Sequence, residues 1–101
     1  MDQIFFKTGF IFTTNAVNEA MKEFPQFAEF CINSLERHRS QDWGDLNDED
    51  KEINNYALIN KERVLSRYDL PANNQFPNHV KIYIITEWHQ SETIILFPCE
   101  Y

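Results

Sequence analysis

The stretch VKIYIITEW, residues 80–88, constrains the fold of this chain more than any other. β-branched and aromatic residues fill it, and its centre is apolar at successive positions rather than at alternate ones. A strand of this kind belongs in the interior of a sheet, with cover on both faces, at least in part. The residues HQSE then favour a turn, and TIILFP returns as an antiparallel neighbour.

Helical periodicity dominates the first half of the chain. Thr14 or Asn15 can cap a helix whose apolar face repeats at i, i+3, i+4 and i+7 and reaches Phe24. Pro25 ends that helix and suits the first turn of the next, so we expect two short helices with a corner between them. Asn47 is expected to cap a third helix because acids follow it. The predicted inward stripe of that helix is Ile53, Tyr56 and Ala57.

Strand patterns flank the helices. Residues 4–13 predict one strand kinked at Gly9, or two short strands that meet there. Residues 63–70 are a strand candidate, and the Pro and Asn content of residues 70–78 predicts a loop. The resulting order is β-α-α-α-β-β-β, which predicts an α+β fold. Two or three short helices should pack on one face of a mostly antiparallel sheet, in a single domain that spans residues 1–101.

The charge balance narrows the choice of partners. Nine Lys and Arg residues oppose sixteen Asp and Glu residues, which gives a net charge of −7. A field of this sign disfavours direct binding of nucleic acid and favours a basic protein partner. Plain solubility explains the same charge equally well.

The two cysteines indicate the compartment. Cys31 and Cys99 lack the spacing of a zinc site or a redox motif, and Cys31 lies among apolar residues, as a small buried side chain would. No segment resembles a signal peptide, and no apolar run approaches the roughly 18 residues of a membrane helix. We therefore expect a soluble, reduced, cytoplasmic protein. We expect no cofactor and no resident metal ion, although one interpretation of residues 37–50 includes a divalent ion.

The stretch RHRSQDWGDLNDED, residues 37–50, carries more polar detail than a helix start requires. A loop site is one interpretation, with His38 as an acid or base and with Asp42 and Asp45 orienting it or holding a divalent ion. In the alternative interpretation, Asp42 or Asp45 pairs with an arginine and ties the loop down. Trp43 is expected to pack against the helices in either case.

A second polar cluster lies at the turn between the last two strands, in TEWHQSET, residues 86–93. Ser91 is expected to bond the turn backbone, because neighbours along a tight turn rarely point at a common catalytic centre. Glu87 needs a partner if it faces inward, and Arg63 or Arg67 would serve. The candidate functional cluster is therefore Arg37, His38, Asp42, Trp43, Asp45, Arg63, Glu87 and Ser91.

These residues carry a resemblance to a family of short bacterial proteins that are described as plasmid-related or mobile-element proteins. The family pattern runs R-H-x-x-G-D-W-G-D-L-x-x-E-D, N-x-x-A-L, R-x-L-S-x-Y and I-T-E-A-D-R-S-x-T-x-x-L-L-P-x-E-Y, and matches fall from Arg37 to Tyr101. This chain departs from it at Gln41, which replaces a glycine, and at residues 88–90, which replace A-D-R. The resemblance implies an association with mobile elements and supplies no mechanism.

Three functions follow as hypotheses. The first is a non-catalytic interaction protein that acts on defence or maintenance machinery of a mobile element. The second is a small hydrolase or nuclease that uses His38, Asp42, Asp45 and Glu87, by a loose analogy of element order with small ribonuclease toxins. The third is a regulator that binds a small molecule beside Trp43 and Trp88.

Overall fold

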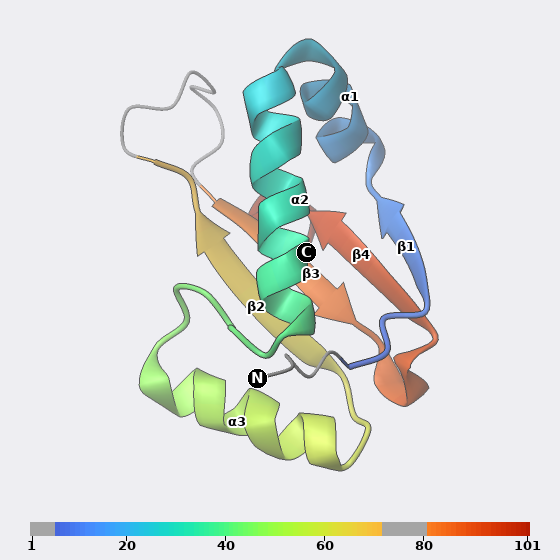
Figure 1. Ribbon diagram of the computed structural model, residues 1–101, viewed down its shortest axis with the longest axis vertical. Coiled ribbons are helices and arrows are strands. Elements are labelled where there is room, and N and C mark those ends of the chain that lie inside the picture. Colours follow the sequence, from blue (N-terminus) through green and yellow to red (C-terminus); the bar gives the residue numbers. More distant parts are fainter. Residues whose placement is uncertain (1–5, 72–80) are drawn as a thin grey trace.

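The structure is a computed structural model that describes residues 6–71 and 81–101. Its sheet has four strands in the order β1-β4-β3-β2, with β1 parallel to β4 and the other pairs antiparallel (Figure 1). In chain order the elements are β1 (Phe10–Thr13), α1 (Asn15–Glu23), α2 (Pro25–Arg39), α3 (Asp48–Ile59), β2 (Val64–Asp69), β3 (Lys81–Thr86), the 3₁₀ turn η1 (Trp88–Gln90), β4 (Glu92–Leu96) and the 3₁₀ turn η2 (Pro98–Glu100). The predicted α+β fold and its order β-α-α-α-β-β-β are confirmed.

Helices α1 and α2 form the main core with one face of the sheet. The α2 side chains Phe27 and Cys31 are completely buried against Ile82 and Ile84 of β3, and α2 crosses the sheet in Figure 1. Burial raises the pKa of the Cys31 thiol to about 12, so this cysteine behaves as the predicted small apolar residue. None of the helices in the described ranges is long and apolar enough to cross a membrane.

The helix ends follow the predicted caps. The Thr14 hydroxyl accepts from the Val17 N–H at 3.2 Å, and the Asn47 side chain accepts from the Asp50 N–H at 2.8 Å. Pro25 begins α2, as predicted. This helix is longer than expected and ends only at Arg39, so His38 lies on its last turn and not in a loop.

The predicted inward stripe of α3 is wrong at two of its three positions. Ile53 is 58% exposed and Tyr56 is 67% exposed, whereas Ala57 and Asn54 are the buried residues of the helix. Asn54 and Ala57 are three positions apart and define a face that a hydrophobicity pattern does not reveal. The helix faces β2 through a short polar side chain and a methyl group, and this leaves its larger apolar residues in solvent.

The other sheet face is covered by side chains. Residues paired in register point to the same side of a sheet, so Ile85 shares this face with Leu65 and Ile94. Ile85 is only 2% exposed there. On the same face the Tyr101 ring contacts Tyr83 edge-on, at 5.8 Å between centroids. The strongest predicted strand is therefore covered completely on one face and in part on the other, where Lys81 and Tyr83 are half-buried. The C-terminal aromatic residue lies against this second face.

Gly9 produces the predicted kink before β1. Its φ is 66°, and a Cβ atom there would lie 2.2 Å from the carbonyl oxygen of Ser91. One strand, β1, follows this glycine. The first two residues of the predicted N-terminal strand, residues 72–78 of the predicted loop and Val80 lie outside the described residues.

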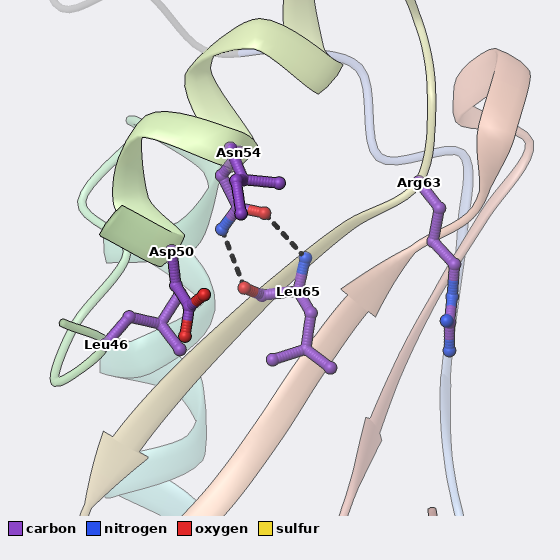
Figure 2. Close-up of a pocket in the computed structure, with 6 residues that line it drawn as sticks. Leu46, Asp50, Asn54, Arg63 and Leu65 are labelled. Carbon is purple, nitrogen blue, oxygen red and sulfur yellow. Dashed lines mark hydrogen bonds between the residues drawn. The ribbon is translucent and has the colours of Figure 1, made fainter. Parts of the chain in front are cut away.

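The outer edge of β2 is satisfied by the segment that precedes it in the chain. Asn54 donates its side-chain N–H to the Leu65 carbonyl at 2.7 Å and accepts from the Leu65 N–H at 3.3 Å, as Figure 2 shows. Further along the strand, the Arg67 carbonyl accepts from the Asp45 N–H at 2.7 Å, and the Arg67 N–H donates to the Trp43 carbonyl at 3.4 Å. The Asp45 carboxylate then accepts from the Asp69 N–H at 2.8 Å. Residues 43–54 therefore act as a substitute neighbour strand.

Replacing Asn54 with Ala should destabilise the protein by about 1–3 kcal/mol, because both backbone groups of Leu65 lose their partner in a partly buried setting. Urea denaturation followed by circular dichroism would measure this change. Asn18→Ala, in the exposed part of α1, is the control and should change the free energy of unfolding by less than about 0.5 kcal/mol. Equal effects of the two substitutions would contradict the edge role of Asn54.

Candidate functional site

His38 lies at the centre of the candidate cluster and is completely buried. Its Nδ1 atom lies 2.5 Å from the Ser66 hydroxyl on β2, and its Nε2 atom lies 2.8 Å from the Thr86 hydroxyl on β3. Phe6 and Trp43 pack edge-on against the ring, at centroid distances of 5.1 and 5.7 Å. The last turn of α2 therefore positions an imidazole between two strands with both ring nitrogens satisfied.

The direction of this hydrogen-bond chain can be deduced from its far end. The Thr93 hydroxyl donates to the carbonyl of Thr8 at 2.7 Å, and a carbonyl can only accept. Thr93 therefore has no proton left for the Thr86 hydroxyl, which lies 2.7 Å away, so Thr86 is the donor to Thr93.

Because the Thr86 hydroxyl proton is used in this way, Thr86 must accept a hydrogen bond from His38. His38 then carries its proton on Nε2, and its Nδ1 accepts from the Ser66 hydroxyl. The tautomer is assigned from the network and follows from the position of the Thr8 carbonyl.

Burial also determines the charge of His38. Desolvation lowers the pKa of the imidazole from 6.5 to about 3, so the ring is neutral near neutral pH. A neutral ring in a closed chain of hydroxyls binds α2 to β2 and β3. The exposed fraction of His38 is 0%, so none of its ring atoms is accessible to a substrate.

Asp42 ties down the loop that follows α2. Its carboxylate pairs with the Arg37 guanidinium at 2.8 Å and accepts from the Gly44 N–H at 3.1 Å. The hydrogen bond from Arg37 is the main cause that lowers the pKa of Asp42. The Asp42 carbonyl accepts from the Tyr68 hydroxyl at 2.7 Å, and Arg37 lies over the Tyr68 ring. The predicted alternative, in which an arginine and an aspartate fasten the loop, describes this contact.

Trp43 and Gly44 complete the loop. Trp43 is 3% exposed, packs with Phe6 and Val64, and donates its indole N–H to Asn55 at 2.8 Å. Gly44 has a φ of 73°, and a Cβ atom there would lie 2.0 Å from the Arg67 carbonyl oxygen. This position therefore requires glycine, because the loop backbone runs directly against β2.

Glu87 and Ser91 belong to the turn between β3 and β4. Glu87 pairs with Arg63 at 3.3 Å, one of the two partners predicted for it. Arg63 also donates to the Tyr101 hydroxyl at 3.0 Å, and its guanidinium lies over the Tyr101 ring. The carbonyl of Ser91 accepts from the Phe10 N–H at 3.2 Å, and its side chain is exposed.

The eight candidate residues therefore do not form one cluster. Asp42 and Asp45 contact the half of β2 that contains Arg67 and Asp69, whereas Glu87 pairs with Arg63 beyond the opposite end of that strand. His38 is the connection, because its Nε2 atom reaches the residue that precedes Glu87. Within the two described ranges, no group of three or more His, Cys, Asp and Glu side chains is arranged to hold a metal ion.

The sequence analysis missed the hydroxyl partners of His38 and the role of Asn54. Ser66, Thr86 and Thr93 are buried at positions that face the helices, next to apolar side chains on the same face of the sheet. Small hydroxyl residues at inward positions are a signal that a polar group from another element is buried against them. That signal indicates a partner, but it does not identify His38 as that partner.

A pocket of about 240 Å³ lies between α3 and β2 (Figure 2). The carboxylate of Asp50 and the exposed side chain of Ile53 lie on its α3 side, and Arg63 and Leu65 close the β2 side. Neither Trp43 nor Trp88 lines this pocket. Its volume is below the range of about 300–1,000 Å³ that small-molecule sites usually occupy, so it fits a single side chain better than a cofactor.

No protein-family model, no curated protein and no solved structure matches this chain.

The buried state of His38 predicts a specific pH dependence. Between its folded pKa of about 3 and its unfolded value of 6.5, the unfolded chain binds the extra proton, so stability falls as the pH falls. From pH 6.5 to about pH 5, above the range of most carboxylates, the free energy of unfolding should fall by about 1.5 kcal/mol. Urea unfolding of the wild type and of His38→Gln would show this component only in the wild type.

The exposed His89 provides the control, since His89→Asn should keep the pH dependence of the wild type. Parallel stability curves for the wild type and His38→Gln would contradict the neutral buried ring. A long-range ¹H–¹⁵N correlation spectrum of the wild type tests the same point independently. It should show a neutral imidazole with its proton on Nε2.

Proposed function

We propose that this protein is a small non-catalytic interaction protein that binds a basic protein partner through the outer face of α3. The main support for this proposal is that three large apolar side chains of this one helix are exposed to solvent. Ile53 is 58% exposed, Tyr56 is 67% exposed and Ile59 is 81% exposed. Spacings of three residues keep them close together along the helix, as in helices that lie in the groove of a partner.

The charge of α3 supports a basic partner. Asp48, Glu49 and Asp50 occupy its first turn, and Glu52 follows, against the single basic residue Lys51. These acids precede the exposed apolar residues along the same helix. An apolar strip next to carboxylates suits a partner whose groove is apolar and whose rim carries Lys or Arg.

The pocket beside α3 supports the same surface. Ile53 belongs both to the exposed strip and to the pocket wall, and Asp50 brings a carboxylate to that wall. A side chain from the partner, with an apolar stem and a cationic end, would match this combination. Arg63 on the opposite wall is already paired with Glu87, so its charge is partly compensated.

The contacts of the candidate cluster support a structural role for it. Arg37, Asp42 and Asp45 hold the loop against β2. His38 binds the helix to the sheet. A hydrolase or nuclease that uses His38, Asp42, Asp45 and Glu87 stays an alternative prediction. It would require His38 to reach solvent from a position that is 0% exposed.

The setting of the proposed function follows from the resemblance. Similarity to plasmid-related and mobile-element proteins leads us to propose that the partner belongs to nucleic-acid-handling machinery, which is commonly basic. We further propose a cytoplasmic location, because Cys31 and Cys99 are both free thiols.

Ile53→Ser combined with Ile59→Ser should abolish capture of the partner from host lysate, because the variant removes two anchors of the strip without touching the core. Quantitative mass spectrometry of an affinity pull-down would measure the enrichment relative to the wild type. The matched control is Ile32→Ser on α2, whose side chain is 57% exposed. All variants should melt within a few degrees of the wild type.

Captured proteins should be basic, and raising the salt should release them because exposed charges are screened. A partner that binds the double variant as well as the wild type would contradict the proposed surface. An acidic or salt-insensitive partner would contradict the charge argument.

A further inference from the structure

The two edges of the sheet are treated differently. The β2 edge is satisfied by Asn54, Asp45 and the backbone of Trp43, as described above. The β1 edge has no strand beside it in the part of the chain that the structure describes, and β1 forms the outer border of the sheet in Figure 1. An edge strand of this kind can accept another strand through its backbone.

The hydrogen bonds to β4 show which groups of β1 point outward. Phe10 and Thr14 donate their N–H groups to carbonyls of the β4 side, at Ser91 and Ile95. Because alternate residues of a strand point their backbone groups in the same direction, the N–H and C=O groups of Ile11 and Thr13 face away from β4. These two residues supply four backbone groups along the open edge.

The side chains of β1 are unusually apolar for an open edge. Phe10 is 77% exposed, Ile11 is 47% exposed and Phe12 is 48% exposed. Proteins commonly protect such edges with Lys or Pro residues. No charged residue and no proline occurs between Lys7 and Glu19. The short length of β1 is the main feature that limits its pairing with another strand.

We propose that β1 pairs with β1 of a second copy of this chain, in an antiparallel arrangement that joins two four-stranded sheets into one. The feature involved is β1, so this inference does not depend on the α3 surface. The absence of charge on β1 favours a second copy of the chain over a charged peptide as the pairing strand. A charged partner peptide would find no complementary group within β1, whereas two acidic copies can meet here without placing like charges face to face.

The two-fold axis would pass beside Phe12. Ile11 of one copy then lies opposite Thr13 of the other, and the two pairs exchange four backbone hydrogen bonds. The two Phe12 side chains face each other as a close non-hydrogen-bonded pair on the same side of the sheet. Phe10 lies at either end of this contact and extends it.

The small contact area between the two β1 strands limits the stability of the dimer. The exposed parts of the three side chains amount to roughly 300 Å² per copy, compared with about 800 Å² per partner in a standard interface. The contact should therefore form a weak dimer whose population depends on protein concentration.

Sedimentation equilibrium of the full chain, from micromolar to near-millimolar concentration, tests the proposal. The apparent mass should rise from that of the 12.1 kDa monomer toward twice that value. Phe12→Lys places two cations opposite each other, and Ile11→Pro removes an outward N–H that β4 does not use. Each should weaken the dimer at least tenfold, checked on variants with wild-type circular dichroism. Ile32→Lys, at an exposed α2 position, should leave the dimer unchanged.

Hydrogen exchange of the wild type tests the edge without any substitution. The amides of Ile11 and Thr13 should become more protected as the concentration rises. A wild-type protein that stays monomeric throughout would overturn the proposal. A dimer that leaves both amides unprotected, or that is lost in Ile53→Ser/Ile59→Ser and kept in folded edge variants, would also overturn it and would place the contact on α3.

Discussion

A buried imidazole with both nitrogens hydrogen-bonded is the contact on which this structure depends. His38 cannot be charged in this position at neutral pH, and each ring nitrogen requires a partner because water is excluded. Ser66 and Thr86 provide those partners, and Thr93 extends the chain of hydrogen bonds to the Thr8 carbonyl. One side chain at the end of α2 therefore fixes the helix relative to three strands and to the segment that enters β1.

A second constraint is the need to satisfy the edge of β2. The loop after α2 and the first half of α3 fulfil this need through backbone groups of the loop and the amide of Asn54. The choice of Asn54 and Ala57 as the inner face of α3 turns Ile53, Tyr56 and Ile59 toward solvent. The proposed recognition surface is thus a consequence of how the edge is closed. The opposite edge, at β1, has no such cover among the described residues, and this difference is the basis for the proposed dimer.

Much of the fold could be predicted because its signals are local. Thr14, Pro25 and Asn47 mark the helix starts through the hydrogen bonds that their own neighbours require. The pairing of Glu87 with Arg63 was also among the expected contacts. The stretch that carries the family resemblance includes His38, Trp43, Gly44, Ser66 and Thr86. The structure gives each of these a bracing contact, while membership in that family stays a prediction.

The sequence by itself determined the element order, the caps and the strand with two apolar faces, because side-chain period and local hydrogen bonding act over a few residues. Only the tertiary structure decided which face of α3 is buried, since the hydrogen-bonding groups at the edge of β2 outweighed the larger side chains. It also decided that His38 belongs to the interior and not to a loop site. Its partners Ser66 and Thr86 lie 28 and 48 positions away in the chain, and no local pattern could select them.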